Sequence, residues 1–359
     1  MTVTSERVSL GVRADLAVRG VRVAAPVVRS KGAGPTDDGH VLVGGFPMAI
    51  PLDSSSPWSI VDGMLLHDAG IEEAVALGSA IQRPKFYDLA TADGISYMQL
   101  ARLHGSSVLA TTVVQTCIRY AEADRCRFCS IEESLNAGAT TRVKTPAQIA
   151  EVAQAAVRLD GVSQLLMTTG TAATADRGAR HLARCAAAVH AVLPELPIQV
   201  QCEPPADLSV LSELHAAGVT AVGIHVESLD EDVRRRWMPG KAAVPMAEYE
   251  SAWREAVRVF GWNRVSTYIL VGLGEDPDQL VAGCERLIEM GVYPFVVPFR
   301  PIAGTLADRD GALAPSAELL VDITERVAAL LRSSGMVGAD QGAGCAACGA
   351  CSALAVVGG

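Results

Sequence analysis

The chain has 359 residues, half of them hydrophobic, and a formal net charge of −10 at pH 7. This acidic balance disfavours a nucleic-acid partner, because phosphate binding draws on clustered Lys and Arg. No apolar run approaches the ~18 residues that a membrane span needs. The length suits one α/β barrel of about 250 residues with a small additional domain, and the composition favours small substrates or protein partners.

The first hundred residues divide into short β-prone pieces. Turn-forming stretches separate them at 32–39 (GAGPTDDG) and 51–57 (PLDSSSP). We predict an N-terminal β-rich module over residues 1–100, ending with a helix at 70–81. The first residues lack the apolar segment of a signal peptide, and the nine cysteines suit a reducing compartment, so we expect a cytoplasmic protein without a disulfide framework.

Three cysteines lie close together in the stretch CIRYAEADRCRFC. Eight residues separate Cys117 from Cys126, and two separate Cys126 from Cys129, with Phe128 just before the last thiol. The apolar run at 107–115 suits a buried parallel strand, so the thiols should follow its C-terminal end, where α/β barrels gather reactive groups. Three thiolates can hold a [4Fe-4S] cluster and leave one iron open to a small molecule. A zinc site completed by a histidine, or inert buried thiols, are the alternatives.

After this loop, strand and helix patterns alternate to residue 333. We predict six parallel strands with right-handed crossovers, which make a partial (β/α)6 TIM-like barrel over residues 101–334. The expected strands are 107–115, 164–169, 198–202, 221–226, 265–271 and 293–298, and the expected helices are 146–159, 174–192, 208–217, 246–260, 277–290 and 315–333.

The last segment, 335–359, is a Cys-containing tail rich in Gly and Ala. It carries a second triplet, Cys345, Cys348 and Cys351, with two residues in each gap. This spacing is typical of an auxiliary iron–sulfur cluster or a zinc knuckle. The alternative is a flexible tail with incidental thiols, because a small Gly/Ala-rich segment is poorly preorganised for metal.

Glycine-rich or basic groups follow three of the barrel strands. Thr169 and Gly170 end the second strand, where carbonyls and hydroxyls can accept bonds from an ammonium group, although a helix N-cap has the same pattern. Gly272 and Gly274 end the fifth strand and allow the backbone to approach a flat ring closely. Arg300, after the sixth strand, either neutralises an anionic ligand or caps the barrel.

Carboxylates follow the third and fourth strands. Period-two spacing puts Gln201 and Glu203 on one face of the third strand, and His225 and Glu227 on one face of the fourth. A carboxylate at a barrel mouth can accept both hydroxyls of a ribose. The alternative for Glu227 is an ion pair with Arg234 or Arg235 on the next helix.

These motifs resemble, in type and order, those of the radical S-adenosylmethionine (SAM) enzymes over residues 107–300. The resemblance implies that a bound [4Fe-4S] cluster cleaves SAM reductively to a 5′-deoxyadenosyl radical, which abstracts hydrogen from a small-molecule substrate. A reductant such as flavodoxin or ferredoxin would supply the electron. The residues implied are Cys117, Cys126 and Cys129 for the cluster, and Phe128, Thr169, Gly170, Glu203, His225, Glu227, Gly272 and Gly274 for SAM.

Two further resemblances are narrower. VGLGED at 271–276 and PFRPIAGT at 298–305 are similar to the lipoyl synthase, biotin synthase and hydrogenase-maturase branch. The whole chain resembles the radical SAM proteins encoded beside a nitrilase in bacterial cyanide-assimilation gene clusters, which implies a role in nitrile or cyanide nitrogen metabolism.

The chain departs from the family pattern in two places. The family's usual first gap between cysteines is three residues, and the branch places an arginine for the SAM carboxylate where this chain has Tyr249, which leaves Arg236 or Lys241 as substitutes. The rival hypotheses are a zinc-stabilised barrel hydrolase or lyase, and a non-catalytic iron–sulfur scaffold or electron-transfer protein.

Overall fold

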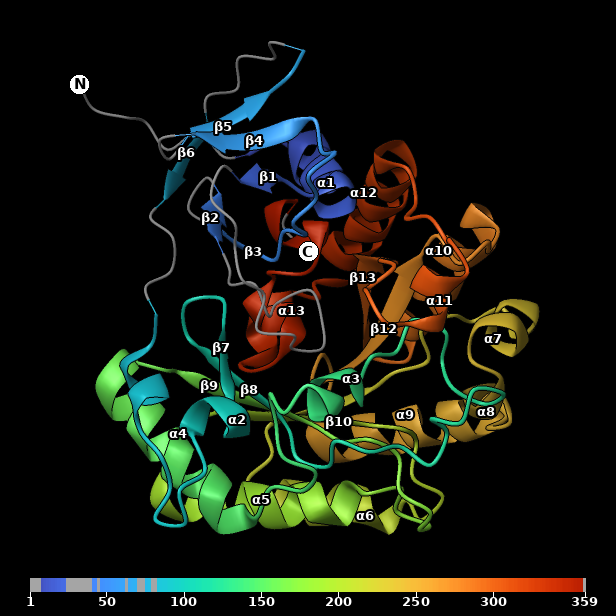
Figure 1. The fold of residues 1–359 in the computed structure, drawn as a ribbon. Coiled ribbons are helices and arrows are strands. Elements are labelled where there is room, and N and C mark those ends of the chain that lie inside the picture. Colours follow the sequence, from blue (N-terminus) through green and yellow to red (C-terminus); the bar gives the residue numbers. More distant parts are fainter. Residues whose placement is uncertain are drawn as a thin grey trace.

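The fold is organised around a curled sheet of seven strands in the order β13-β12-β11-β10-β9-β8-β7 (Figure 1). The computed structural model describes residues 8–23, 41–43, 46–61, 64–69, 75–78 and 83–357. Strand β7 is antiparallel to β8, and the other neighbours are parallel. The strands are β7 (Arg102–His104), β8 (Val108–Thr112), β9 (Gln164–Thr168), β10 (Ile198–Cys202), β11 (Ala221–Ile224), β12 (Val265–Val271) and β13 (Val292–Pro298).

Helices connect the parallel strands and pack on one face of the sheet, so the predicted partial barrel is confirmed. The edge strand β7 was not predicted. The long helices are α4 (Pro146–Asp160), α5 (Ala179–Val192), α6 (Ser209–Ala216), α9 (Met246–Phe260), α10 (Pro277–Glu289) and α12 (Ala317–Ser334). Short helices are α2 (Tyr97–Leu100), α3 (Glu133–Asn136), α7 (Glu231–Trp237), α8 (Pro239–Ala242) and α11 (Leu306–Arg309), with a 3-10 turn η1 (Lys85–Asp88). None of the helices in these described ranges has the length and hydropathy needed to cross a bilayer.

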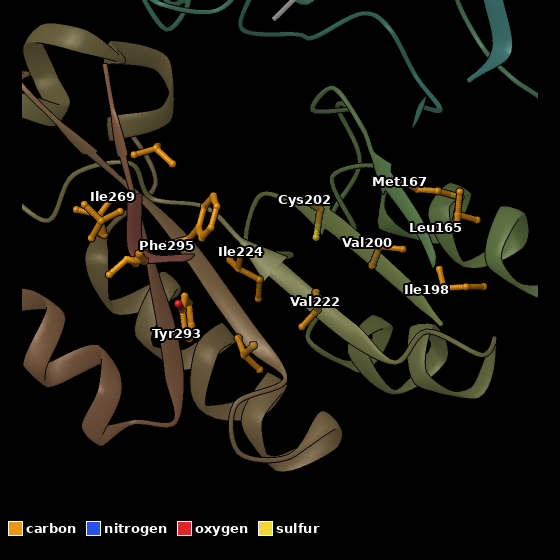
Figure 2. Close-up of a cluster of buried hydrophobic side chains, with 14 of the residues drawn as sticks. Leu165, Met167, Ile198, Val200, Cys202, Val222, Ile224, Ile269, Tyr293 and Phe295 are labelled. Carbon is orange, nitrogen blue, oxygen red and sulfur yellow. The ribbon is translucent and has the colours of Figure 1, made fainter. Parts of the chain in front are cut away.

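Alternate residues of each strand face opposite sides of the sheet. Leu165, Met167, Ile198 and Val200 belong to the buried apolar core (Figure 2). The residues between them, such as Gln199, point to the concave side. The core therefore lies between sheet and helices, and the concave side is left for polar groups and for other parts of the chain.

The N-terminal part of the chain forms a second sheet, with its strands in the order β1-β4-β5-β6-β2-β3. Its strands are β1 (Arg22–Val23), β2 (Val41–Val43), β3 (Phe46–Met48), β4 (Trp58–Val61), β5 (Met64–His67) and β6 (Val75–Gly78). The helix predicted at 70–81 is wrong where the structure describes it, because β6 pairs with β5 and β2 there. A short apolar run does not distinguish strand from helix, and the other residues of that prediction lie outside the described ranges.

The N-terminal region also contains a helix that was not predicted, α1 (Leu10–Arg19), packed against α12. Its boundary signals are present in the sequence. The Ser9 hydroxyl accepts from the Val12 amide at 3.3 Å, and Gly20, with φ of 69°, ends the helix.

The C-terminal tail is folded against the concave side of the barrel, with α13 between the two sheets (Figure 1). It forms η2 (Gly338–Gln341), α13 (Cys345–Cys348) and η3 (Ala353–Val356). The Gly344 amide donates to the Gln164 side chain on β9 at 2.7 Å, and the Ser352 hydroxyl donates to the Val296 carbonyl on β13 at 2.6 Å. The tail is thus anchored on both sides of the half barrel.

We expect Gly344→Ala to loosen this anchoring. Gly344 has φ of 97° and ψ of −165°, a region that is essentially restricted to glycine, and a Cβ atom there would overlap the buried Gln199 side chain. Backbone strain and overpacking together should lower the free energy of unfolding by about 2 to 5 kcal/mol, measured by urea denaturation under reducing conditions. Gly335→Ala is the control, because its φ of 71° imposes strain without any overlap, for a loss of roughly 1 to 2 kcal/mol. Equal losses would contradict the packing argument.

Candidate active site

A cavity lies at the C-terminal ends of the central strands. Its empty space amounts to about 760 Å³ when counted out to open solvent. All three cysteines of the first triplet line it, together with side chains from the ends of β9, β10 and β11. Its predicted members are Cys117, Cys126, Phe128, Cys129, Thr169, Gly170, Gln201, Glu203, His225 and Glu227.

The long gap in the cysteine triplet is a loop tied to the far side of the barrel. The Asp124 carbonyl accepts from the Gly240 amide of α8 at 2.9 Å. The Arg127 amide donates to the Trp237 carbonyl at the end of α7 at 2.7 Å. The inserted residues therefore form the wall of the cavity nearest α7 and α8, and they hold Cys126 and Cys129 against that wall.

The other end of the loop is packed against the end of β9. The Gly170 amide donates to the Val114 carbonyl at 2.8 Å, and the Ile118 amide donates to the Thr171 carbonyl at 3.0 Å. A Cβ atom at Gly170 would overlap the Thr116 carbonyl oxygen, next to Cys117. Gly170 was predicted from its place at a strand end, and the structure adds a packing reason for glycine at this position.

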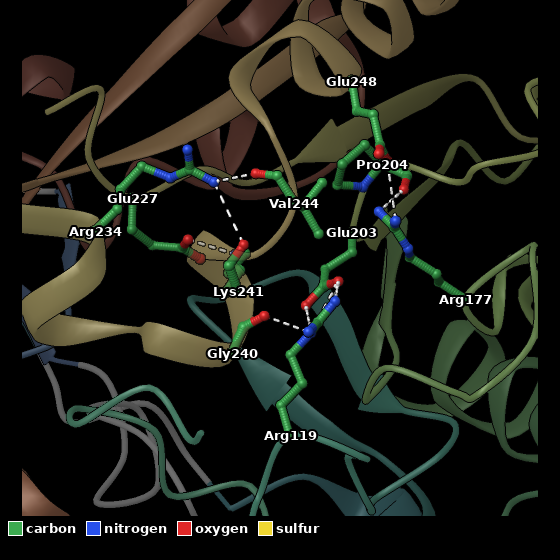
Figure 3. Close-up of polar contacts among 10 residues, drawn as sticks. All are labelled: Arg119, Arg177, Glu203, Pro204, Glu227, Arg234, Gly240, Lys241, Val244 and Glu248. Carbon is green, nitrogen blue, oxygen red and sulfur yellow. Dashed lines mark hydrogen bonds and ion pairs between the residues drawn. The ribbon is translucent and has the colours of Figure 1, made fainter. Parts of the chain in front are cut away.

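Two buried ion pairs cross the cavity wall (Figure 3). Arg119, from the inserted loop, binds Glu203 at the end of β10 with Nε–Oε1 of 3.0 Å. Lys241, from α8, binds Glu227 at the end of β11. Each pair joins the end of a strand to another segment, the inserted loop in one case and α8 in the other. The sequence alone did not place these segments at the cavity wall.

Glu227 has an unusual backbone. Its φ of 62° lies in the left-handed region, which costs a residue with a Cβ of the order of 1–3 kcal/mol. Its amide and carbonyl are both bonded to β12, at Tyr268 and Leu270, and this pairing holds the conformation. Strained residues of this kind gather at functional sites, and here the strain directs a carboxylate into the cavity.

The alternative partners for Glu227 are excluded by the contacts of the next helix. Arg234 donates to the Val244 carbonyl at 2.7 Å, and Arg235 binds the exposed Glu231 of its own helix. The alternative of an ion pair between Glu227 and either arginine is therefore wrong. Arg234 is bonded to the segment after α8, and Arg235 is bonded to a residue of its own helix, α7.

The electrostatics of this wall centre on Lys241. Burial alone would lower the pKa of Lys241, but the Glu227 carboxylate raises it above its ordinary value. Burial raises the pKa of Cys126 and brings that of Cys129 to about 11. The two thiols therefore stay protonated at neutral pH until a metal displaces their protons.

His225, which lines the cavity, has one unsatisfied ring nitrogen. Its Nδ1 accepts from the Tyr268 amide at 3.2 Å, so the proton of the neutral ring lies on Nε2. That Nε2 is buried and has no partner in the described part of the chain. Burial, with Lys241 nearby, lowers the pKa of His225 to about 3, so the ring is a neutral donor at physiological pH.

Some predicted residues are not at this cavity. Gly272 and Gly274 are not among the described residues that line it, and a Cβ at Gly274 would meet the Arg236 guanidinium. Of the two substitutes for the family's arginine, Lys241 lines the cavity and Arg236 donates instead to the Leu273 carbonyl. Arg300 lies elsewhere too, and its Nε donates to the Ala17 carbonyl at 2.9 Å.

Sequence reasoning missed Arg119 and Arg125, which line the cavity from the inserted loop. The signal was their place between the first two cysteines. Loop side chains carry no periodicity, however, so nothing in the sequence indicated that they turn inward.

The thiols are not arranged around a single ion. No group of three or more His, Cys, Asp or Glu in the residues that the structure describes is placed to hold one metal ion. Zinc draws four ligands to about 2.0–2.3 Å from one point, whereas the thiolates of a [4Fe-4S] cluster bind separate irons and stand further apart. The donor set, with three thiols around one cavity, fits a cluster better than zinc.

Comparison with known proteins agrees with this chemistry. The model of the family described as the Radical SAM superfamily matches residues 123–287. This central part of the chain is thus similar to the radical SAM superfamily. Members of this superfamily use a [4Fe-4S] cluster and SAM. The match begins after Cys117, so the cysteine before the long gap lies outside it.

Individual radical SAM relatives overlap only part of the chain. A bacteriochlorophyllide c C-7(1)-hydroxylase from Chlorobaculum limnaeum is 34% identical over 141 residues, which is 39% of this chain and 34% of that protein. The chain thus spans about a third of the curated relative's length. The FeFe-hydrogenase maturase HydG from Carboxydothermus hydrogenoformans is 18% identical, with a TM-score of 0.48 over 63% of this chain and 50% of HydG.

We expect Lys241→Met to destabilise the apo protein by about 3 to 5 kcal/mol, because it leaves the Glu227 carboxylate buried without a counter-charge. The double variant Lys241→Met, Glu227→Gln should recover most of that loss, since both charges are gone. The measurement is urea denaturation of the metal-free chain.

A matched control for this cycle is the exposed pair of Arg235 and Glu231. Arg235→Met should change stability by no more than about 0.5 kcal/mol. A double variant as unstable as Lys241→Met alone would show that the loss comes from packing and not from an unpaired charge.

Proposed function

We propose that this chain is an enzyme that uses a [4Fe-4S] cluster to cleave SAM and transfer hydrogen from a small-molecule substrate. The single observation that carries the proposal is that three thiols, the Thr169–Gly170 strand end and two buried carboxylates all line one cavity. Cys117, Cys126 and Cys129 would hold the cluster. A reduced cluster in this place would supply the electron that cleaves a C–S bond of SAM, and the resulting 5′-deoxyadenosyl radical would abstract a hydrogen atom from the substrate.

The cavity residues have separate tasks in holding SAM. Glu227, aligned by its strained backbone and paired with Lys241, accepts from the ribose hydroxyls. His225 donates from Nε2 on the same side. Thr169 and the carbonyls around Gly170 accept from the SAM ammonium group. These roles account for the unpartnered Nε2 of His225 and for the strained backbone of Glu227.

Arg125 is our candidate for the SAM carboxylate. It lines the cavity next to Cys126, and among the described residues no carboxylate pairs with it. Its Nε is buried without a partner, while its guanidinium stacks over Tyr120 at 4.7 Å and donates to the Gly304 carbonyl at 3.3 Å. A guanidinium held this way still has donors for a bidentate carboxylate, whereas Lys241 is engaged by Glu227.

The substrate would reach the cavity beside Gln201, whose amide lies on the concave side of β10. We propose a role in nitrile or cyanide nitrogen metabolism, which rests on the resemblance to the nitrilase-linked radical SAM proteins. The electron would come from a flavodoxin or ferredoxin. A cytoplasmic location suits nine cysteines that are all free thiols. Comparing metabolites of a strain carrying the gene with those of its deletion would identify the substrate.

The chain reconstituted with iron and sulfide under anaerobic conditions should release 5′-deoxyadenosine and methionine when dithionite and SAM are added. Cys126→Ala should abolish both products, because the cluster loses one of three thiolates. Cys284→Ala, in the buried face of α10, is the matched control and should keep the activity. Wild-type protein that binds iron but makes no 5′-deoxyadenosine would favour the scaffold hypothesis, and zinc in place of iron would favour the hydrolase.

A further inference from the structure

The second cysteine triplet is built into the interior of the half barrel. Cys345 and Cys348 are three residues apart on the helical turn α13, so they lie on one face of it. Both pack against a small apolar cluster formed by Val108 and Ala110 of β8 and Leu166 of β9. After α13, Gly349 takes φ of 67° and turns the chain toward Cys351. The three thiols are thus held by folded structure on two sides.

This triplet shares a wall with the SAM cavity. The Gln201 amide lines the cavity and donates to the Cys345 sulfur at 3.3 Å. The Tyr268 hydroxyl donates to the same sulfur at 2.7 Å, and its ring is stacked on His225 with centroids 4.3 Å apart. One side chain on β10 and one on β12 therefore separate Cys345 from the space where SAM and substrate would bind.

Buried positive charge faces the triplet from the other side. Arg13 of α1 is 2% exposed, and it donates to the carbonyls of Gly349 at 2.7 Å and Ser352 at 3.1 Å, on either side of Cys351. The guanidinium of Arg300, after β13, also interacts electrostatically with Cys351. Among the described residues, neither arginine forms an ion pair with a carboxylate.

Taking the guanidinium of Arg13, and part of that of Arg300, out of water without a counter-ion is costly, because carbonyl oxygens bring no negative charge. Three thiolates bound to iron would supply this negative charge close to both arginines. Donors from Gln201 and Tyr268 would stabilise the same charge through bonds to a thiolate sulfur. The surroundings of the triplet are therefore those of an anionic metal centre.

We propose that Cys345, Cys348 and Cys351 bind a second iron–sulfur cluster, enclosed between the half barrel and the N-terminal region and separated from the SAM cavity by Gln201 and Tyr268. This site does not depend on SAM cleavage. Its position puts the second cluster beside the substrate, with the buried Arg13 and the half-buried Arg300 as its counter-charges.

The first test counts iron and sulfide in the full chain after anaerobic reconstitution. Wild-type protein should hold more than the about four irons of one [4Fe-4S] cluster. The triple variant of Cys345, Cys348 and Cys351 to Ala should lose the excess and keep the rest. The triple variant of Cys117, Cys126 and Cys129 to Ala should lose the iron of the first cluster and keep the iron of the second. Cys284→Ser should hold as much iron as wild type. Circular dichroism checks that each variant is folded.

The outcomes separate this inference from the proposed function. Iron and sulfide that survive in the variant lacking Cys117, Cys126 and Cys129, with an iron–sulfur signal in electron paramagnetic resonance, support the second site even when no 5′-deoxyadenosine forms. A tail variant that keeps all the iron of wild type, or zinc bound there in place of iron, overturns it.

The second test measures the counter-charge in the variant lacking Cys117, Cys126 and Cys129, where only the second cluster contributes. Arg300→Gln removes a positive charge and should shift the midpoint reduction potential to a more negative value, because the reduced cluster is the more negative state. Arg300→Lys keeps the positive charge, so its midpoint reduction potential should stay closer to that of the parent variant. Equal potentials in the two variants would contradict the assigned role of Arg300, since a purely structural arginine would not distinguish them.

Discussion

The strict alternation of side chains along β10 is the constraint on which both halves of the site depend. Ile198, Val200 and Cys202 are buried toward the helices, so the residues between them must point to the concave side. There Gln199 and Gln201 meet the C-terminal tail, and Glu203, just past the strand, meets the cysteine loop. A shift of one residue in the register of β10 with β9 would exchange the core for the site.

Burial of charge explains how the cysteine loop and α8 become fixed. Arg119 and Glu203, like Lys241 and Glu227, are poorly exposed, and each charge needs its partner. Because the partners come from different segments, satisfying the charges also fixes the loop and α8 relative to the strand ends. These pairs add positional specificity to the site more than they add net stability, since desolvation offsets much of their attraction.

The features that could be predicted from the sequence are those that a local pattern of residues determines. Strands and helices of the barrel came from periodicity, and the residues at strand ends were found because a parallel sheet brings its C-terminal ends to one edge. Arg119, Arg125 and the pairing of Lys241 with Glu227 could not be found this way, since they depend on how a loop without periodicity folds back. Helix α1 could have been predicted from its boundary residues, Ser9 and Gly20. The β-prone residues that follow it led instead to the prediction of strands throughout this region.

The long first gap in the cysteine triplet has a physical role in this architecture. A gap of three residues would hold three thiols by local geometry alone, whereas eight residues add the loop-closure entropy of a longer segment. Here that cost is offset by contacts at both ends: Arg119 is bound to Glu203, and the Asp124 carbonyl is bound to α8. The same contacts bring Arg125 to the cavity wall. The inserted residues therefore not only span the distance between the first two cysteines but also add the cationic side chains of Arg119 and Arg125 to the cavity wall.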